Sequence, residues 1–108
     1  MNQQIIAACK SLAGLQAVAA ISGFDEVLRF DKRSVRGSIE GLAFELQQLN
    51  LPAANFLINT LGNIARDCDR AESDTDVHSV TKRLEAVVNE TWGVLHLAAG
   101  LEPAHSTN

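Results

Sequence analysis

Apolar residues recur at spacings of three and four along most of the chain, which is the pattern of helices that each bury one face. The clearest stretch has Val77, Val80, Leu84, Val87, Thr91, Leu95 and Ala98 as its repeating positions. Ser73 and Asp76 are suited to cap its start, where exposed amides favour a hydroxyl and an acid. Gly100 is suited to end it in the left-handed conformation, and Pro103 prevents continuation. The pattern therefore predicts a helix over residues 74–99.

The same periodicity predicts three more long helices, over residues 2–22, 34–49 and 52–70, and a short helical turn near 24–30. Ser34 is expected to cap the second long helix, Ser22 the short turn, and Pro52 is expected in the first turn of the third long helix. Their expected buried stripes are Ile5, Ala8, Leu12, Leu15 and Ala19; Val35, Ile39, Leu42, Leu46 and Leu49; and Ala54, Leu57, Ile58, Leu61, Ile64, Ala65 and Cys68. Four helices joined by short links predict an all-α fold, an up-and-down antiparallel four-helix bundle.

Gly14 of the first predicted helix and Gly37 and Gly41 of the second lie inside helical patterns. Each costs a helix about 1 kcal/mol relative to alanine. We expect them to mark places where another helix comes close.

The first predicted helix is apolar around most of its circumference. Besides its main stripe it carries a second apolar face, formed by Ile6, Ala17, Val18 and Ile21. A helix of this kind is normally buried on more than one side. Either the helix is central in the monomer, or its second face forms a homodimer; the small size of the domain favours the dimer.

Composition supports a single helical domain over residues 1–102, followed by a flexible tail over 103–108. The chain has 108 residues, of which 46% are apolar, and a net charge of −4, which disfavours nucleic acid or an anionic membrane as its main partner. No uninterrupted apolar run is long enough for a membrane span, and no convincing leader is present, so the expected location is cytoplasmic.

Trp92, the only tryptophan, flanks the apolar face of the last helix and is expected to contribute strongly to stability.

Candidate chemistry is sparse. Cys9 and Cys68 fit buried apolar positions better than a disulfide. The acidic run from 67 to 76 fits neither register of an EF-hand loop and is interpreted as a solvated loop leading into the last helix. His78 and His96 are separated by roughly 27 Å of helix, too far to share one metal ion. We therefore predict no catalytic residue, no cofactor and no metal site, and a protein that is not an enzyme.

One polar pattern is harder to dismiss. Asn55, Asn59 and Asn63 stand four residues apart on the third long helix, Arg66 and Arg70 continue their line, and Phe56 lies beside it. Phe44 lies opposite the buried stripe of the second long helix. The line is either an ordinary solvated face or a recognition surface, since amides, arginines and aromatic rings are typical of interface hot spots.

The sequence thus favours a small protein–protein interaction module, an adaptor, regulator or inhibitor of another protein, acting as a homodimer. The alternative is a small helical nucleic-acid-associated regulator that uses the basic cluster of Arg29, Lys32, Arg33 and Arg36. That cluster is small, and the net charge opposes it.

Overall fold

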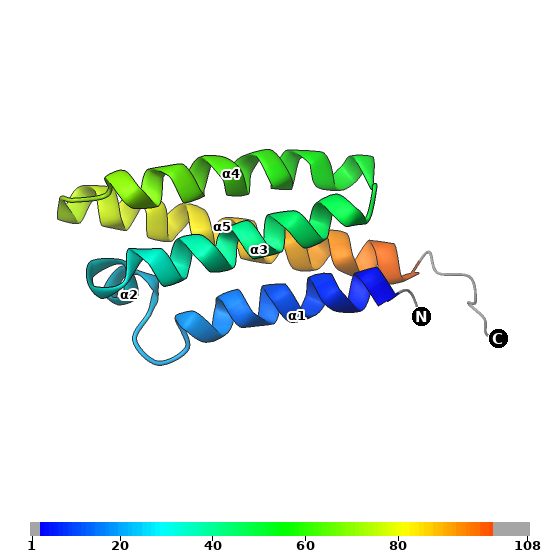
Figure 1. Cartoon of the computed structure of the whole chain (residues 1–108), viewed down its shortest axis with the longest axis horizontal. Coiled ribbons are helices and arrows are strands. Elements are labelled where there is room, and N and C mark those ends of the chain that lie inside the picture. The colour runs from blue at the N-terminus through cyan, green and yellow to red at the C-terminus, as the bar shows by residue number, and fades with distance from the viewer. Residues whose placement is uncertain (1–2, 101–108) are drawn as a thin grey trace.

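The computed structural model describes residues 3–100 and is helical nearly throughout, with no strand in that range (Figure 1). The helices are α1 (Gln3–Val18), α2 (Phe24–Phe30), α3 (Lys32–Gln48), the short 3₁₀ helix η1 (Pro52–Ala54), α4 (Asn55–Arg70) and α5 (Asp74–Gly100). The all-α prediction is confirmed. The expected tail, 103–108, lies outside the described residues.

The four long helices lie side by side along the molecule, and the chain reverses direction from each to the next (Figure 1). The most extensive contact joins α3 to α4, which are connected by the short link through η1. α1 packs on α3 and α5, and α4 also packs on α5. The short α2 lies at one end, against α3 and α5.

One core holds these helices together, and most of the expected stripes form it. The buried residues of the long helices include Ile5, Ala8, Leu12 and Leu15 of α1; Val35, Ile39, Leu42 and Leu46 of α3; Leu57, Leu61, Ile64, Ala65 and Cys68 of α4; and Val77, Val80, Leu84, Val87, Thr91, Leu95 and Ala98 of α5. α2 adds Phe24 and Leu28. Each helix therefore buries one side, as its spacing predicts.

The predicted helix boundaries are wrong at several places. α1 ends at Val18 rather than 22, and the chain turns before α2. α3 begins at Lys32, and Asp31 rather than Ser34 is its N-cap, since the Asp31 carboxylate accepts hydrogen bonds from the Ser34 N–H (3.2 Å) and hydroxyl (2.6 Å). The reason is the length of the link: α2 ends at Phe30, so only one residue is left to cap the next helix.

Backbone conformation explains the other differences at helix ends. Gly23, with φ of 88°, precedes α2 in place of a Ser22 cap. Pro52 begins the 3₁₀ turn, and α4 starts only at Asn55. Gly100 is the last residue of α5 and does not have the positive φ expected of a left-handed helix end. Gly23 is the glycine whose positive φ this fold requires.

The expectation that Gly14, Gly37 and Gly41 mark close helix contacts is wrong. All three are exposed, and a Cβ added at any of them would meet no atom within 4 Å. A glycine allows two helices to come close only if it lies on the side where the second helix packs. The spacing of residues along one helix does not show which side that is.

We predict that Gly37→Ala and Gly41→Ala each stabilise the protein by about 0.5–1 kcal/mol, because alanine removes the helix penalty without a clash. Urea unfolding of the single and double variants measures the effect. Gly23→Ala is the matched control and should destabilise, since its φ is 88° and its Cβ would lie 2.9 Å from Asp25 Oδ1. A loss of stability in Gly37→Ala or Gly41→Ala would contradict the assignment of an open outer face.

Trp92 is half-buried. Its ring packs against the core, and its Nε1 donates a hydrogen bond to Gln16 Oε1 of α1 at 2.9 Å. The side chain thus joins α5 to α1 at their shared surface.

We predict that Trp92→Ala costs about 2–3 kcal/mol of unfolding free energy, less than the roughly 3–5 kcal/mol of a fully buried site, because part of the ring is already in water. Trp92→Phe should keep most of the packing and lose only about 0.5–1 kcal/mol with the hydrogen bond. Chemical unfolding of both variants tests this. A Trp92→Ala protein as stable as the parent would show that the ring makes no useful packing contact.

Candidate interaction surface

The outward face of α4 carries the polar line that the sequence singled out. Ion pairs mark its two edges: Asp69 Oδ2 accepts from Arg36 of α3 at 2.7 Å, and Asp67 Oδ2 accepts from Arg83 of α5 at 2.7 Å. At about 100° per residue, Asn59 lies about 80° from each of these two aspartates. Asn59 therefore points away from both neighbouring helices.

The other residues of this line are exposed as well: Asn55, Asn63, Arg66 and Arg70. Arg66 donates a hydrogen bond to Asn63 Oδ1 within the helix. The Asn55 and Asn59 amides make no hydrogen bond to any part of the chain that the structure describes. We call these five residues the α4 face; its amides at 55 and 59 are open to solvent.

Phe44 and Phe56 are both exposed, at 58% and 67%, but the structure does not bring them together. Phe56 is eleven residues before Asp67, which places it about 20° from that aspartate, on the α5 side of α4. Phe44 belongs to α3, about 80° from Arg36 and so turned away from the side that meets α4. Phe56 therefore lies beside the α4 face, whereas Phe44 lies on the outward side of α3, and the two rings form no single aromatic cluster.

The second apolar face of α1 is partly open. Ile21 is 99% exposed in the turn after the helix, Ile6 is 37% exposed, and Ala17 is exposed between them. Val18 is half-buried and packs against the core. The exposed apolar part of this face is therefore Ile6, Ala17 and Ile21.

Two of the four cations of the basic cluster, Arg29 and Arg36, form ion pairs with carboxylates. Arg29 donates to Asp74 at 3.0 Å, and this hydrogen bond raises the pKa of the Arg29 guanidinium further above neutrality. Arg36 bonds Asp69 in the same way, and its pKa is likewise raised. These two arginines therefore link α2 to α5 and α3 to α4.

The acidic run is not the solvated loop that was expected. Asp67 and Asp69 belong to α4, Asp74 and Asp76 belong to α5, and only residues 71–73 lie between the helices. Three of these aspartates form ion pairs with arginines of other helices, and the carboxylate of the fourth, Asp76, accepts from the N–H groups of Ser73 and Glu72 at the start of α5. Sequence reasoning missed this because each arginine partner is 16 to 45 residues away along the chain.

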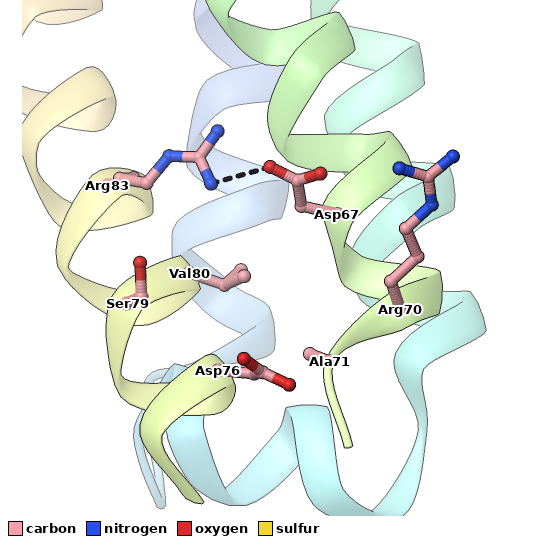
Figure 2. A pocket seen from close by; sticks show the side chains of 7 residues that line it. All are labelled: Asp67, Arg70, Ala71, Asp76, Ser79, Val80 and Arg83. Carbon is pink, nitrogen blue, oxygen red and sulfur yellow. Dashed lines mark hydrogen bonds and ion pairs between the residues drawn. The ribbon is translucent and has the colours of Figure 1, made fainter. Parts of the chain in front are cut away.

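A small hollow of about 210 Å³ lies between the end of α4 and the start of α5 (Figure 2). Asp67, Arg70, Ala71, Asp76, Ser79, Val80 and Arg83 line it. Figure 2 shows Arg83 reaching across to Asp67, while the Arg70 side chain points away from this pair. The Asp67–Arg83 pair links α4 to α5, and the Asp76 carboxylate caps the start of α5.

Capping also sets the pKa of two carboxyls. The predicted cap at Ser73 is confirmed, since Ser73 Oγ accepts from the Asp76 N–H at 3.1 Å. In return Asp76 Oδ2 accepts from the N–H groups of Ser73 and Glu72, and these hydrogen bonds lower the pKa of Asp76. The Ser34 hydroxyl and N–H lower the pKa of Asp31.

Cys68 is buried as predicted, and burial raises the pKa of its thiol to about 11. Cys9 is half-buried, and neither cysteine forms a disulfide within the described range. His78 and His96 are exposed on α5. Within residues 3–100, no three His, Cys, Asp or Glu side chains come close enough together to hold a metal ion. None of the described helices has the length and apolar content needed to cross a membrane.

Comparison with known proteins gives no match to any family model, to any curated protein or to any solved structure.

We predict that Asp31 and Asp76 contribute to the acid sensitivity of folding. Because both pKa values are lowered in the folded state, their contribution is fully present above the ordinary Asp value of about 3.9 and is lost as the pH falls through the lowered values. A double variant, Asp31→Asn with Asp76→Asn, should be less stable than the parent at pH 7, and this difference should shrink as the pH drops below 4. Thermal unfolding across pH measures it. Glu90→Gln, at an exposed site outside the caps, is the control; a pH-independent gap for the double variant would be inconsistent with the caps.

Proposed function

We propose that this protein is a non-enzymatic protein–protein interaction module that binds a partner through the α4 face. The observation that carries the proposal is the row of three exposed asparagines facing away from every neighbouring helix, with the amides of Asn55 and Asn59 unbonded. Such amides supply donors and acceptors together, and the arginines of the same face supply charge.

The asparagines do not help the helix to form. Asn59 and Asn63, which lie inside α4, each cost about 0.5 kcal/mol relative to alanine, because the side chain competes with the backbone for hydrogen bonds; Asn55 is the first residue of the helix. Asn59 does not recover this cost through a contact within residues 3–100. A role in binding accounts for this; folding does not.

In the up-and-down antiparallel bundle expected from the sequence, α4 is held between α3 and α5. Helix α4 packs extensively on α3 and also on α5, which supports a rigid backbone beneath the α4 face. Rigid presentation favours binding, because less conformational entropy is lost when the partner docks.

The basic-cluster alternative receives less support. Arg29 and Arg36 are paired with carboxylates, so a nucleic acid would have to displace Asp74 and Asp69 to use them. Only Lys32 and Arg33 of the cluster remain without an ion pair among residues 3–100. Nucleic-acid affinity grows with the number of phosphates neutralised, and two cations provide little.

We further propose that the protein acts as a homodimer through the exposed apolar part of α1. Within α1 the only charged residue is Lys10, although the helix has an open outer side. A sparsely charged helix face with exposed isoleucines at Ile6 and Ile21 suits contact with a second copy.

We predict that replacing Asn55, Asn59 and Asn63 together by alanine raises the free energy of unfolding by about 1–2 kcal/mol and weakens partner binding. The partner is captured from native cells with the parent protein, identified by mass spectrometry and then titrated against the parent and the variant. Stability and affinity should move in opposite directions.

The matched control is Asn89→Ala with Glu90→Ala, at exposed positions of α5. It should leave affinity unchanged. If the triple variant binds as tightly as the parent while becoming more stable, the α4 face is merely solvated and the proposal fails.

For the dimer, sedimentation equilibrium at tens of micromolar should give twice the chain mass of 11.6 kDa. Ala17→Glu should shift the protein to the monomer without unfolding it, because Ala17 is exposed and a glutamate there would meet the apolar face of the partner copy. Lys82→Gln, on the exposed side of α5, makes the same change of net charge and should leave the dimer intact. A monomeric parent protein would refute the dimer.

A further inference from the structure

The corner between α2 and α3 exposes an aromatic ring. Phe30 is the last residue of α2 and is 79% exposed. Leu28, two residues earlier, is fully buried, and two residues correspond to about 200° of helix rotation. Asp31, the next residue, already caps α3, so the link between α2 and α3 is too short to cover the ring. The exposure of Phe30 therefore follows from the geometry of the corner.

Cations surround this ring. Phe30 lies in a shallow hollow of about 410 Å³ whose other lining residues are Arg29, Asp31, Lys32, Arg33, Arg36 and Asp69. Arg36 is paired with Asp69, Arg29 is paired with Asp74, and the Asp31 oxygens are held by Ser34. The Ser34 hydrogen bonds leave the charge of Asp31 in place, but the four cations of the lining outnumber the two carboxylates, Asp31 and Asp69. Lys32 and Arg33 have no ion pair within residues 3–100, so the hollow keeps a local positive charge in a chain whose net charge is −4.

We propose that this corner is a second contact site, which binds a short acidic segment of a partner protein: Lys32 and Arg33 pair with its carboxylates, and an apolar side chain of the segment packs on Phe30. Charge complementarity supplies the negative groups, and the uncovered ring supplies the apolar anchor. We call Phe30, Lys32 and Arg33 the basic corner.

Acids around the basic corner favour a short ligand over a nucleic acid. Asp25 and Glu26 stand on α2, Asp69 on α4 and Asp74 at the start of α5. A nucleic acid carries one charge on every nucleotide, so a strand that leaves the corner would approach these carboxylates. A peptide can confine its negative charge to the few residues that meet Lys32 and Arg33.

This inference rests on the proposed function, since it adds a partner contact, but it uses a different part of the molecule. The α4 face and the basic corner can therefore fail separately. Loss of peptide binding in the variants below says nothing about Asn59, and an unchanged affinity of the asparagine variant says nothing about Phe30.

The test uses three fluorescein-labelled probes and anisotropy titrations at low salt. The first is a short peptide of Asp and Glu with one Phe and one Leu, the second has Ser in place of both apolar residues, and the third is a short oligothymidylate. The first probe should bind the parent protein about tenfold more tightly than the second. Its affinity should fall as sodium chloride is added, because exposed ion pairs are screened.

Two variants locate the site. Lys32→Glu with Arg33→Glu should weaken binding of the first probe about tenfold or more, because attraction becomes repulsion. Phe30→Ser should bring the affinity for the first probe down to that for the second. Glutamates in the first turn of α3 favour the helix, so the charge variant should keep its melting temperature. Lys10→Glu with Lys82→Glu makes the same change of net charge at exposed sites of α1 and α5, and should leave binding unchanged.

Equal affinity for the first two probes would overturn the role of Phe30. Equal losses in the two charge-reversal variants would show that net charge, not the basic corner, governs binding. Tighter binding of the oligothymidylate than of the acidic peptide would overturn the choice of a protein segment.

Discussion

Burial of one apolar stripe from each long helix is the interaction on which the rest of the structure depends. Leu12 of α1, Leu42 of α3, Leu61 of α4 and Leu84 of α5 are all fully buried in a single core. At roughly 1.5–3 kcal/mol for each such side chain, this term far exceeds any surface ion pair. Because the stripe of each helix must face the others, its opposite side is turned to solvent, and the exposed surfaces are fixed by the same contacts.

The charged end of the molecule has a different role. Asp67, Asp69 and Asp74 bond to arginines on three other helices, through side chains that remain substantially exposed. Such pairs contribute little to stability individually. They instead fix which helix end lies against which, and they remove Arg29 and Arg36 from the charge available to a ligand. At the α2–α3 corner, the cations left without an ion pair within residues 3–100 are Lys32 and Arg33.

Besides the exposed apolar part of α1, the α4 face and the α2–α3 corner carry groups that folding does not use. The α4 face holds open amides at Asn55 and Asn59, and the corner holds Phe30 beside two cations without an ion pair. They differ in chemistry, since the first offers mainly hydrogen bonds and the second offers charge and an aromatic ring. A protein that binds through both surfaces would recognise two chemical features of its partner. Either surface can be altered by mutation without changing the core.

The sequence by itself determined the helices and their buried sides, because the spacing of Val35, Ile39 and Leu42, or of Leu57, Leu61 and Ile64, is a local property of one helix. It also identified the α4 asparagines as exposed, since they lie opposite that stripe. Only the tertiary structure decided what depends on a second helix: that Gly37 and Gly41 face solvent, that the acidic run is divided between α4 and α5, and that Arg36 pairs with Asp69. Those outcomes depend on how helices distant in the sequence are placed against each other, and periodicity along one helix carries no information about the residues that its neighbour presents.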